Sequence, residues 1–352
     1  MFNLYVRRTK YLFLGSLFFI CILSICSCAK DETSNNKNIL DARYGIVQTS
    51  LQQNKTCLDI YDSNCKLLKS QNYNVCGVGR FGYGSPQSLN GVLYEIAVGN
   101  DYKKDLGLVI GFDLRTGKIK KYHFNRTNLV DLQIIDKYIY TISNINGKTY
   151  IDRYCFESQE IDSFCWNKEL MTDFAVTETG NVFFVNPKGT IYFLEFDDKK
   201  TIQIGQLEQD VEPSHLHAVN DKLYISLFSN EIMVVDARSR NITMLDLGLE
   251  CGGQISDDGE YLYVASSNPV ESLEDGRIVK VNMDTNEIVN KWNFDCDIYY
   301  FIIGKEDVTI LSNNNNELRR YLLQKGKLGK MRSAKLDEKY TLSSVGSIEN
   351  SR

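Results

Sequence analysis

Three residues that could bind a metal ion or transfer protons are evenly spaced along the chain. Asp131, Asp173 and His215 follow one another at intervals of 42 residues. His217 lies two positions after His215, and would share its face of a strand because strand side chains alternate with a period of two. Two carboxylates and an imidazole that converge could bind a divalent metal or hold a proton-transfer pair. This chemistry requires a repeating fold that brings the residues together.

A repeat of suitable length runs through the sequence. Short runs of Val, Ile, Tyr and Phe alternate with turns of Asn, Asp, Gly and Lys, which is typical of many short strands. One strand, turn and strand pattern recurs seven times, most clearly at 111–119, 235–242 and 281–288. The equivalent turn positions are Asp62, Asp113, Cys155, Phe196, Asp236, Asn282 and Leu322. They lie 40 to 51 residues apart, close to the length of a four-stranded propeller blade.

Four strands in each of seven repeats predict an all-β fold, a seven-bladed β-propeller of antiparallel blades. The first repeat supplies only three strands, at 43–51, 55–62 and 66–71. Because an open ring would leave a blade edge unpaired, we predict that the strand-like run 339–345 completes the first blade and closes the ring. The alternatives are a two-sheet sandwich or several small β domains.

One repeat carries a family resemblance. Residues 256–266, Ser-Asp-Asp-Gly-Glu-Tyr-Leu-Tyr-Val-Ala-Ser, and the strand that follows at 276–282 resemble the YVTN-type repeat of seven-bladed propellers. The resemblance implies the same fold. The tryptophan-aspartate and glycine-histidine signatures of WD40 repeats are missing, so the partners of that related family are not carried over.

In this fold the innermost strands line a central channel, and ligands usually meet the channel mouth. Asp131, Asp173 and His215 would each open an inner strand of consecutive blades, so we expect them to cluster there. The structural alternative is that a channel mouth needs polar side chains and that Asp at a strand start caps a turn. A glycine-aromatic loop at 80–86 offers Phe81 and Tyr83, which could stack on a sugar or a partner protein, or pack over their own blade.

The N-terminus has the features of an export signal. Residues 11–27 carry no charge, follow Arg7, Arg8 and Lys10, and end at Cys28. They are too few for a typical spanning helix and fit a cleaved signal, with an uncleaved anchor as the alternative. Residues 25–28, Ile-Cys-Ser-Cys, resemble a bacterial lipobox. The resemblance implies that residues 1–27 are removed and that Cys28 is acylated.

The expected mature chain has three parts. Residues 28–38 are polar and form a flexible tether, 39–346 form the propeller, and 347–352 are a short tail. Residues 29–32, Ala-Lys-Asp-Glu, look like the tag that directs some Bacteroidota lipoproteins to the outer face of the outer membrane. We therefore expect a lipid-anchored protein of the cell envelope, with the outer membrane or cell surface favoured.

Charge and cysteine content exclude several classes. Residues 1–27 contain three cations and no acid, so their removal changes the net charge of the chain from −5 to −8. Nucleic acid is therefore not expected as a partner. Seven cysteines remain besides Cys28, none in a Cys-x-x-Cys pair, so we expect mostly buried free thiols and no structural zinc. Gly-x-Ser-x-Gly and His-Glu-x-x-His motifs are missing from the sequence.

The sequence therefore favours a monomeric propeller domain that binds an envelope protein or a glycan, without a reaction or cofactor of its own. The alternative is a hydrolase on the same scaffold, similar to the lactonases that use propeller channels. Asp131, Asp173 and His215 would then hold a divalent metal at the channel mouth.

Overall fold

The computed structural model describes residues 39–50, 55–75, 78, 87–97, 107–171, 173–208, 213–249, 252–266 and 275–348. The chain divides into two compact units, Met1–Asn38 and Ile39–Arg352, and every described residue belongs to the second. The predicted signal, the tether and Cys28 lie outside the described residues. In the described part, no helix is long and apolar enough to cross a membrane.

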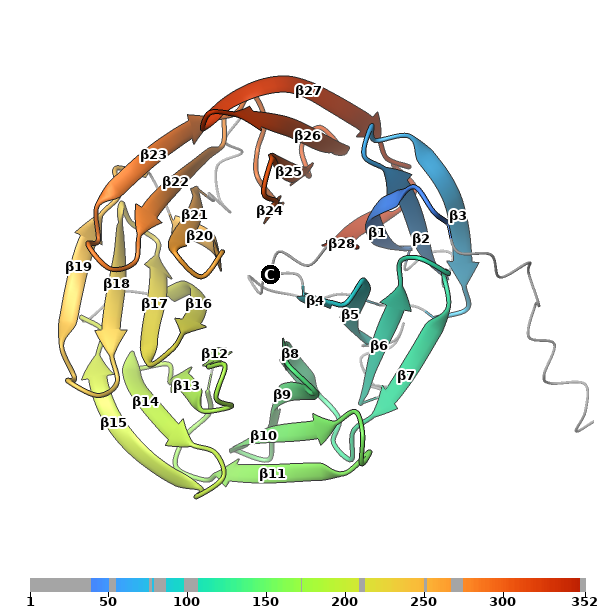
Figure 1. Cartoon of the computed structure of the whole chain (residues 1–352). Coiled ribbons are helices and arrows are strands. Elements are labelled where there is room, and N and C mark those ends of the chain that lie inside the picture. The colour runs from blue at the N-terminus through green and yellow to red at the C-terminus, as the bar shows by residue number, and fades with distance from the viewer. Residues whose placement is uncertain are drawn as a thin grey trace, which may run out of the picture. The chain divides into compact units, whose positions relative to one another are not determined.

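The second unit is a seven-bladed β-propeller, as predicted. Its described residues form 28 strands, in seven antiparallel sheets of four strands. Figure 1 shows these sheets as blades around a central axis, each with one strand near the axis and one at the rim. Within blades 2 to 7 the strands follow chain order from the axis outward.

The strand bounds follow the predicted repeat. Blade 1 contains β28 (Thr341–Ser347), β1 (Ala42–Ser50), β2 (Lys55–Asp62) and β3 (Leu67–Tyr73), and blade 2 contains β4 (Gln87–Leu89), β5 (Val92–Ala97), β6 (Leu108–Asp113) and β7 (Ile119–His123). Blade 3 contains β8 (Leu129–Ile135), β9 (Tyr138–Ile145), β10 (Lys148–Cys155) and β11 (Ile161–Trp166). Blade 4 contains β12 (Asp173–Val176), β13 (Val182–Val185), β14 (Thr190–Glu195) and β15 (Lys200–Gln206). Blade 5 contains β16 (Pro213–Val219), β17 (Lys222–Leu227), β18 (Glu231–Asp236) and β19 (Ile242–Asp246). Blade 6 contains β20 (Gly252–Asp257), β21 (Tyr261–Ser266), β22 (Arg277–Asn282) and β23 (Ile288–Asn293). Blade 7 contains β24 (Tyr300–Ile303), β25 (Asp307–Ser312), β26 (Glu317–Gln324) and β27 (Lys327–Lys335).

The C-terminal strand closes the ring, which confirms the predicted closure. β28 is the innermost strand of blade 1 and pairs with β1, with Val345 fully buried opposite Ile46. Arg115 of blade 2 holds both ends of the described chain. Its carbonyl accepts the Ile39 N–H at 3.0 Å, and its guanidinium donates to the Ile348 carbonyl at 3.3 Å.

The turn between the third and fourth strands explains why the repeat was visible in the sequence. In blade 2 the Asp113 carboxylate accepts the backbone N–H groups of Arg115 and Thr116 at 2.8 and 2.9 Å. Asp236 and Asn282 make the same paired contacts in blades 5 and 6. These side chains stabilise a tight turn locally, so the turn has a sequence signature.

Seven hydrophobic clusters fill the seven contacts between neighbouring blades. Along β13, Val182 and Phe184 pack with blade 3, whereas Phe183 and Val185 pack with blade 5. Successive strand side chains point to opposite faces, so a strand covered on both faces is apolar throughout. The cluster between blades 7 and 1 includes residues of β1, β25, β26 and β28, so packing as well as strand pairing joins the last blade to the first.

Candidate functional site

The residues predicted for the channel mouth lie on inner strands of consecutive blades. Asp131 is on β8, Asp173 begins β12, and His215 and His217 are on β16. Asp131 and His215 are buried. Each Asp carboxylate accepts the backbone N–H of the residue that follows it, at 2.8 Å in both cases. This contact matches the alternative to a ligand-binding role, in which Asp at the start of a strand caps a turn.

The four candidates do not form a converging ligand set. All of them are described, and among the described residues no three His, Cys, Asp or Glu side chains are arranged to hold a metal ion. The pairing of β8 with β9 shifts between Leu129 and Asp131, and that of β16 with β17 shifts between Pro213 and His215. Such irregularities locally disrupt the regular strand geometry beside Asp131 and His215.

His217 instead joins two blades. Its Nε2 lies 2.8 Å from an Asp257 carboxylate oxygen at the end of β20, in blade 6. The two side chains are 24% and 12% exposed. Nearby, the Ser214 hydroxyl of β16 donates to the Gly252 carbonyl of β20 at 2.6 Å. The imidazole is thus part of the contact between blades 5 and 6.

Glutamine side chains make similar bridges between other inner strands. Gln133 of β8 donates to the Phe174 carbonyl at 3.0 Å and accepts the Val176 N–H at 2.9 Å, both in β12. Gln254 of β20 makes the same two contacts with the backbone of Phe301 in β24, at 3.0 and 2.8 Å. An amide offers both a donor and an acceptor, so one side chain can satisfy both groups of a neighbouring strand. These polar residues stabilise the ring.

A larger hollow lies on one face of the propeller. Its volume is about 1430 Å³. It is bordered by turns of blades 2, 6 and 7 that link the first strand to the second or the third strand to the fourth. The start of β1 and the end of β28, both in blade 1, complete its border. We call this side of the propeller the turn face. The hollow, here the turn-face groove, is lined by six cations and three acids: Arg43, Arg115, Lys280, Lys305, Lys325 and Lys327, and Asp258, Glu260 and Asp307.

Two of these acids are already engaged by the fold. The Asp307 carboxylate, 3% exposed, accepts hydrogen bonds from Arg320 Nε at 2.7 Å and the Tyr44 hydroxyl at 3.2 Å. Burial, and then the charge of Asp307, raise the pKa of Tyr44. Burial alone would raise the pKa of Asp258, but hydrogen bonds from Tyr263 and from backbone N–H groups hold that pKa below its ordinary value. With six cations against three acids, the groove lining has an excess of positive charge in a protein whose net charge is negative.

Aromatic side chains form part of the groove wall but do not present open faces. Tyr263 and Trp292 stack with centroids 6.2 Å apart and planes 8° apart, and both are at most 5% exposed. The Trp292 indole donates to the Gly326 carbonyl at 2.8 Å, across the contact between blades 6 and 7. Lys280 Nζ lies 3.6 Å from the centre of the Tyr261 ring.

A second hollow on the turn face has the opposite charge. It measures about 540 Å³ and lies over blades 4 to 6. Its lining contains five acids and two cations: Glu178, Asp221, Asp236, Glu260 and Asp284, and Lys222 and Arg238. Glu260 borders both hollows, so the charge changes sign across one turn.

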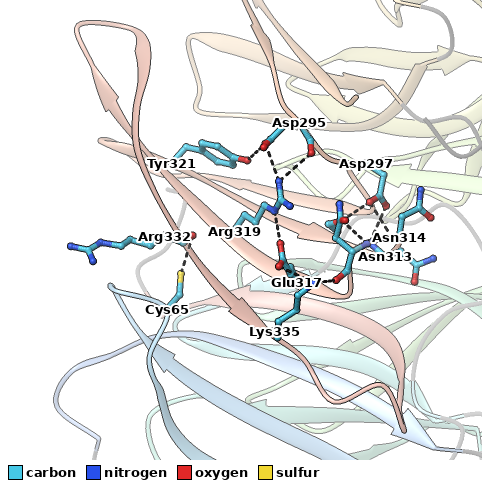
Figure 2. Close-up of polar contacts among 12 residues, drawn as sticks. Cys65, Asp295, Asp297, Asn313, Asn314, Glu317, Arg319, Tyr321, Arg332 and Lys335 are labelled. Carbon is cyan, nitrogen blue, oxygen red and sulfur yellow. Dashed lines mark hydrogen bonds and ion pairs between the residues drawn. The ribbon is translucent and has the colours of Figure 1, made fainter. Parts of the chain in front are cut away.

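Blade 7 also carries a dense polar network, shown in Figure 2. Arg319 donates to Glu317 at 2.7 Å and to Asp295 at 2.9 Å, and Tyr321 also donates to Asp295. Lys335 on β27 lies 3.0 Å from the other Glu317 oxygen. Burial alone would raise the pKa of Glu317, but Lys335 and Arg319 hold that pKa below its ordinary value.

The sequence of blade 7 contained a local excess of cations, which the negative net charge of the whole chain concealed. Between Glu317 and Asp337 there is no acid, whereas the interval contains seven cations. Its alignment to the outer two strands of the last blade would have placed those cations at the rim. Phe81 and Tyr83, the other predicted ligand contacts, lie outside the described residues.

Comparison with known proteins supports the fold alone. No family model and no curated protein match the chain. Similar solved structures include a suggested 6-phosphogluconolactonase from Bacteroides fragilis, with 14% identity over 90% of this chain and 100% of that one and a TM-score of 0.60. A chain of the mitotic checkpoint complex shares 13% identity over 72% and 80%, with a TM-score of 0.55. Apo AztD from Citrobacter koseri shares 9% over 86% and 97%, with a TM-score of 0.51. At these identities, function has to be argued from the site.

Proposed function

We propose that this protein is a lipid-anchored protein of the cell envelope whose propeller binds a partner protein and catalyses no reaction of its own. The turn-face groove is the binding surface. The observation that carries the proposal is its size and charge, about 1430 Å³ with six cations against three acids. Pockets for small molecules usually measure roughly 300 to 1,000 Å³, so a groove this large and open suits a segment of a protein.

The contacts of the polar residues favour binding over catalysis. His217 and Gln254 bridge neighbouring inner strands, and Asp307 is held by Arg320. A general acid or base needs a lone pair or proton directed at substrate, and these groups direct theirs at the protein. The hydrolase alternative would need the converging set that the described candidates do not form.

A protein partner is favoured over a glycan. Sugar sites commonly use the open face of an aromatic ring, but Tyr263 and Trp292 cover each other and are buried. The exposed side chains at the groove include four cations, two acids and Val289, which is 53% exposed: Arg115, Lys305, Lys325 and Lys327, with Asp258 and Glu260. Such a mixture of charge and apolar surface is usual in protein interfaces.

The position of Ile39 relates the groove to the proposed anchor. Its N–H bonds to the carbonyl of Arg115, a residue of the groove lining. With acylation at Cys28, a tether of residues 28–38 would reach roughly 35 Å when extended. The propeller would then stay within that distance of the membrane, and its partner would be in the outer membrane or at the cell surface.

Site-specific crosslinking in intact cells tests the proposal. A photoreactive residue replaces Val289 at the groove, and in a control it replaces Met244, which is 40% exposed on β19 of blade 5. We expect Val289 to crosslink one envelope protein reproducibly and Met244 not to do so. Equal patterns from both positions, or none from Val289, would contradict the groove as a binding surface. Retention in the membrane fraction after Cys28→Ser would contradict the lipid anchor.

A further inference from the structure

We infer that the outer strand of blade 7, β27, binds an acidic, extended segment of the partner protein. This rests on the proposed function and names the chemistry of the partner. The cationic strip consists of Lys325, Lys327, Lys330 and Arg332. Lys325 and Lys327 also line the turn-face groove, so the strip continues the groove along the rim of blade 7.

The strip contains the cations that the fold leaves unpaired. Of the seven cations between Glu317 and Asp337, three have acidic partners: Arg319 with Glu317 and Asp295, Arg320 with Asp307, and Lys335 with Glu317. The four residues of the strip are exposed and form no ion pair with any described residue. Their charges are available to a ligand.

The arrangement carries a cost inside the sheet. Arg332 on β27 lies directly opposite Arg320 on β26 in the strand register. Like charges at directly opposite positions of antiparallel strands are destabilising. Asp307 offsets the charge of Arg320, but Arg332 has no acid of its own among the described residues. A binding role gives a physical reason for a cation at this position.

Protection of a sheet edge does not account for the strip. Lysines on edge strands commonly prevent unwanted pairing, and each blade has an outer edge strand. β27 carries four cations, β7 carries two, and β11 and β19 carry none. If cations were needed to protect every edge, the strands without them would be equally exposed to pairing.

The geometry of the strip fits an extended polypeptide. Its cations are separated by two or three residues along nearly one strand, which spans roughly 25 Å at the rise of a β-strand. β27 has nine residues and pairs only with β26 among the described strands. Met331, 40% exposed, adds apolar surface between the charges. Acidic side chains at similar intervals would complement it.

A membrane or nucleic acid fits less well. A lipid surface is flat and would need cations on several neighbouring outer strands, but β23 and β3 each carry only one, Lys291 and Lys69. Single-stranded nucleic acid is usually held by aromatic stacking as well as by cations, and β27 has no aromatic residue.

Binding of a defined peptide tests the inference with the mature chain from Cys28. The probe is a fluorescent peptide of alternating Glu and Gly, with a Lys and Gly peptide as its control. The test variant is K327E/K330E, and the matched control is K120E/K121E on β7, which changes net charge equally on another outer strand. We expect the acidic peptide to bind the wild type more weakly as salt rises, and the test variant to lose about tenfold or more in affinity. The control variant should bind like the wild type.

Several outcomes would overturn the inference. The first is an equal loss of affinity in the two variants, and the second is no binding of the acidic peptide by the wild type at low salt. The third is that the wild type binds mixed phosphatidylglycerol and phosphatidylcholine vesicles through Lys327 and Lys330 but does not bind the peptide. Cooperative melting of each variant verifies folding, and K327Q/K330Q should show an intermediate loss. Crosslinking at Val289 can succeed while this test fails, so the two proposals are separable.

Discussion

The inner ring and the rim of blade 7 use polar side chains in opposite ways. At the axis, Gln133, Gln254 and His217 direct their polar atoms at the neighbouring blade. At the rim, Lys327, Lys330 and Arg332 direct theirs at solvent. Polar groups near the axis therefore stabilise this fold, whereas the exposed cations of the last outer strand are the groups that we propose to bind a partner. The comparison predicts that inner-ring changes reduce stability, whereas rim changes reduce binding.

Removal of the closing strand should have the largest effect on stability. Deletion of residues 337–352 removes β28, exposes the edge of β1 and uncovers the buried Val345 contact with Ile46. We expect a loss of about 5 kcal/mol or more in the free energy of unfolding, from lost apolar burial and strand pairing. Thermal melting followed by circular dichroism measures it. Deletion of 349–352 alone is the control, and unchanged melting after the longer deletion would show that β28 does not close the ring.

Gln254→Ala tests the bridges of the inner ring. The substitution removes two hydrogen bonds to the backbone of Phe301, a residue that is 1% exposed. We expect a destabilisation of about 1 to 3 kcal/mol, because a buried N–H and C=O would lose their partner. Urea unfolding measures it, with Gln203→Ala on the exposed surface of β15 as the control. Equal stability of the two variants would remove the structural role assigned to the inner ring.

The sequence predicted the fold well because the repeat depends on a local turn and the closure on a general requirement to pair a strand edge. The turn at Asp113 and its equivalents stabilises itself, and the need to pair the edge of β1 specified a closing strand. The site was less predictable. Spacing placed Asp131 and His215 on the correct strands, but the register shifts beside them could not be read from the spacing. The rim strip depends on which cations find acids in space, and the ion pair of Arg320 with Asp307, for example, cannot be read from the order of residues alone.

Glu317→Gln tests the paired part of blade 7. Because the pKa of Glu317 is lowered in the folded protein, its ionised form stabilises the fold at pH values above its ordinary pKa of 4.5. This contribution is lost as pH falls through the lowered pKa. We expect the variant to be less stable than wild type by about 1 kcal/mol at neutral pH, and the difference to shrink in acid.

Urea unfolding at pH 7 and pH 3 measures this difference. The matched control is Glu195→Gln, whose carboxylate is 37% exposed and lies 3.5 Å from Lys200 at the corresponding strand pair of blade 4. Exposed pairs contribute little, so the control should change stability by only a few tenths of a kcal/mol. A difference between wild type and Glu317→Gln that stays constant with pH would indicate lost packing and not lost charge.

Arg332→Thr should have the smallest effect and the opposite sign. It removes a like charge opposite Arg320 and places a β-branched residue in a strand, so we expect a gain of about 0.2 to 0.5 kcal/mol together with weaker binding of the acidic peptide. Lys121→Thr on β7, opposite Ile110, makes the same kind of change without a like-charge neighbour. If both variants gain equally, strand propensity explains the result. A gain confined to Arg332→Thr, with weaker peptide binding, would mean that this rim position carries a cation at the expense of stability.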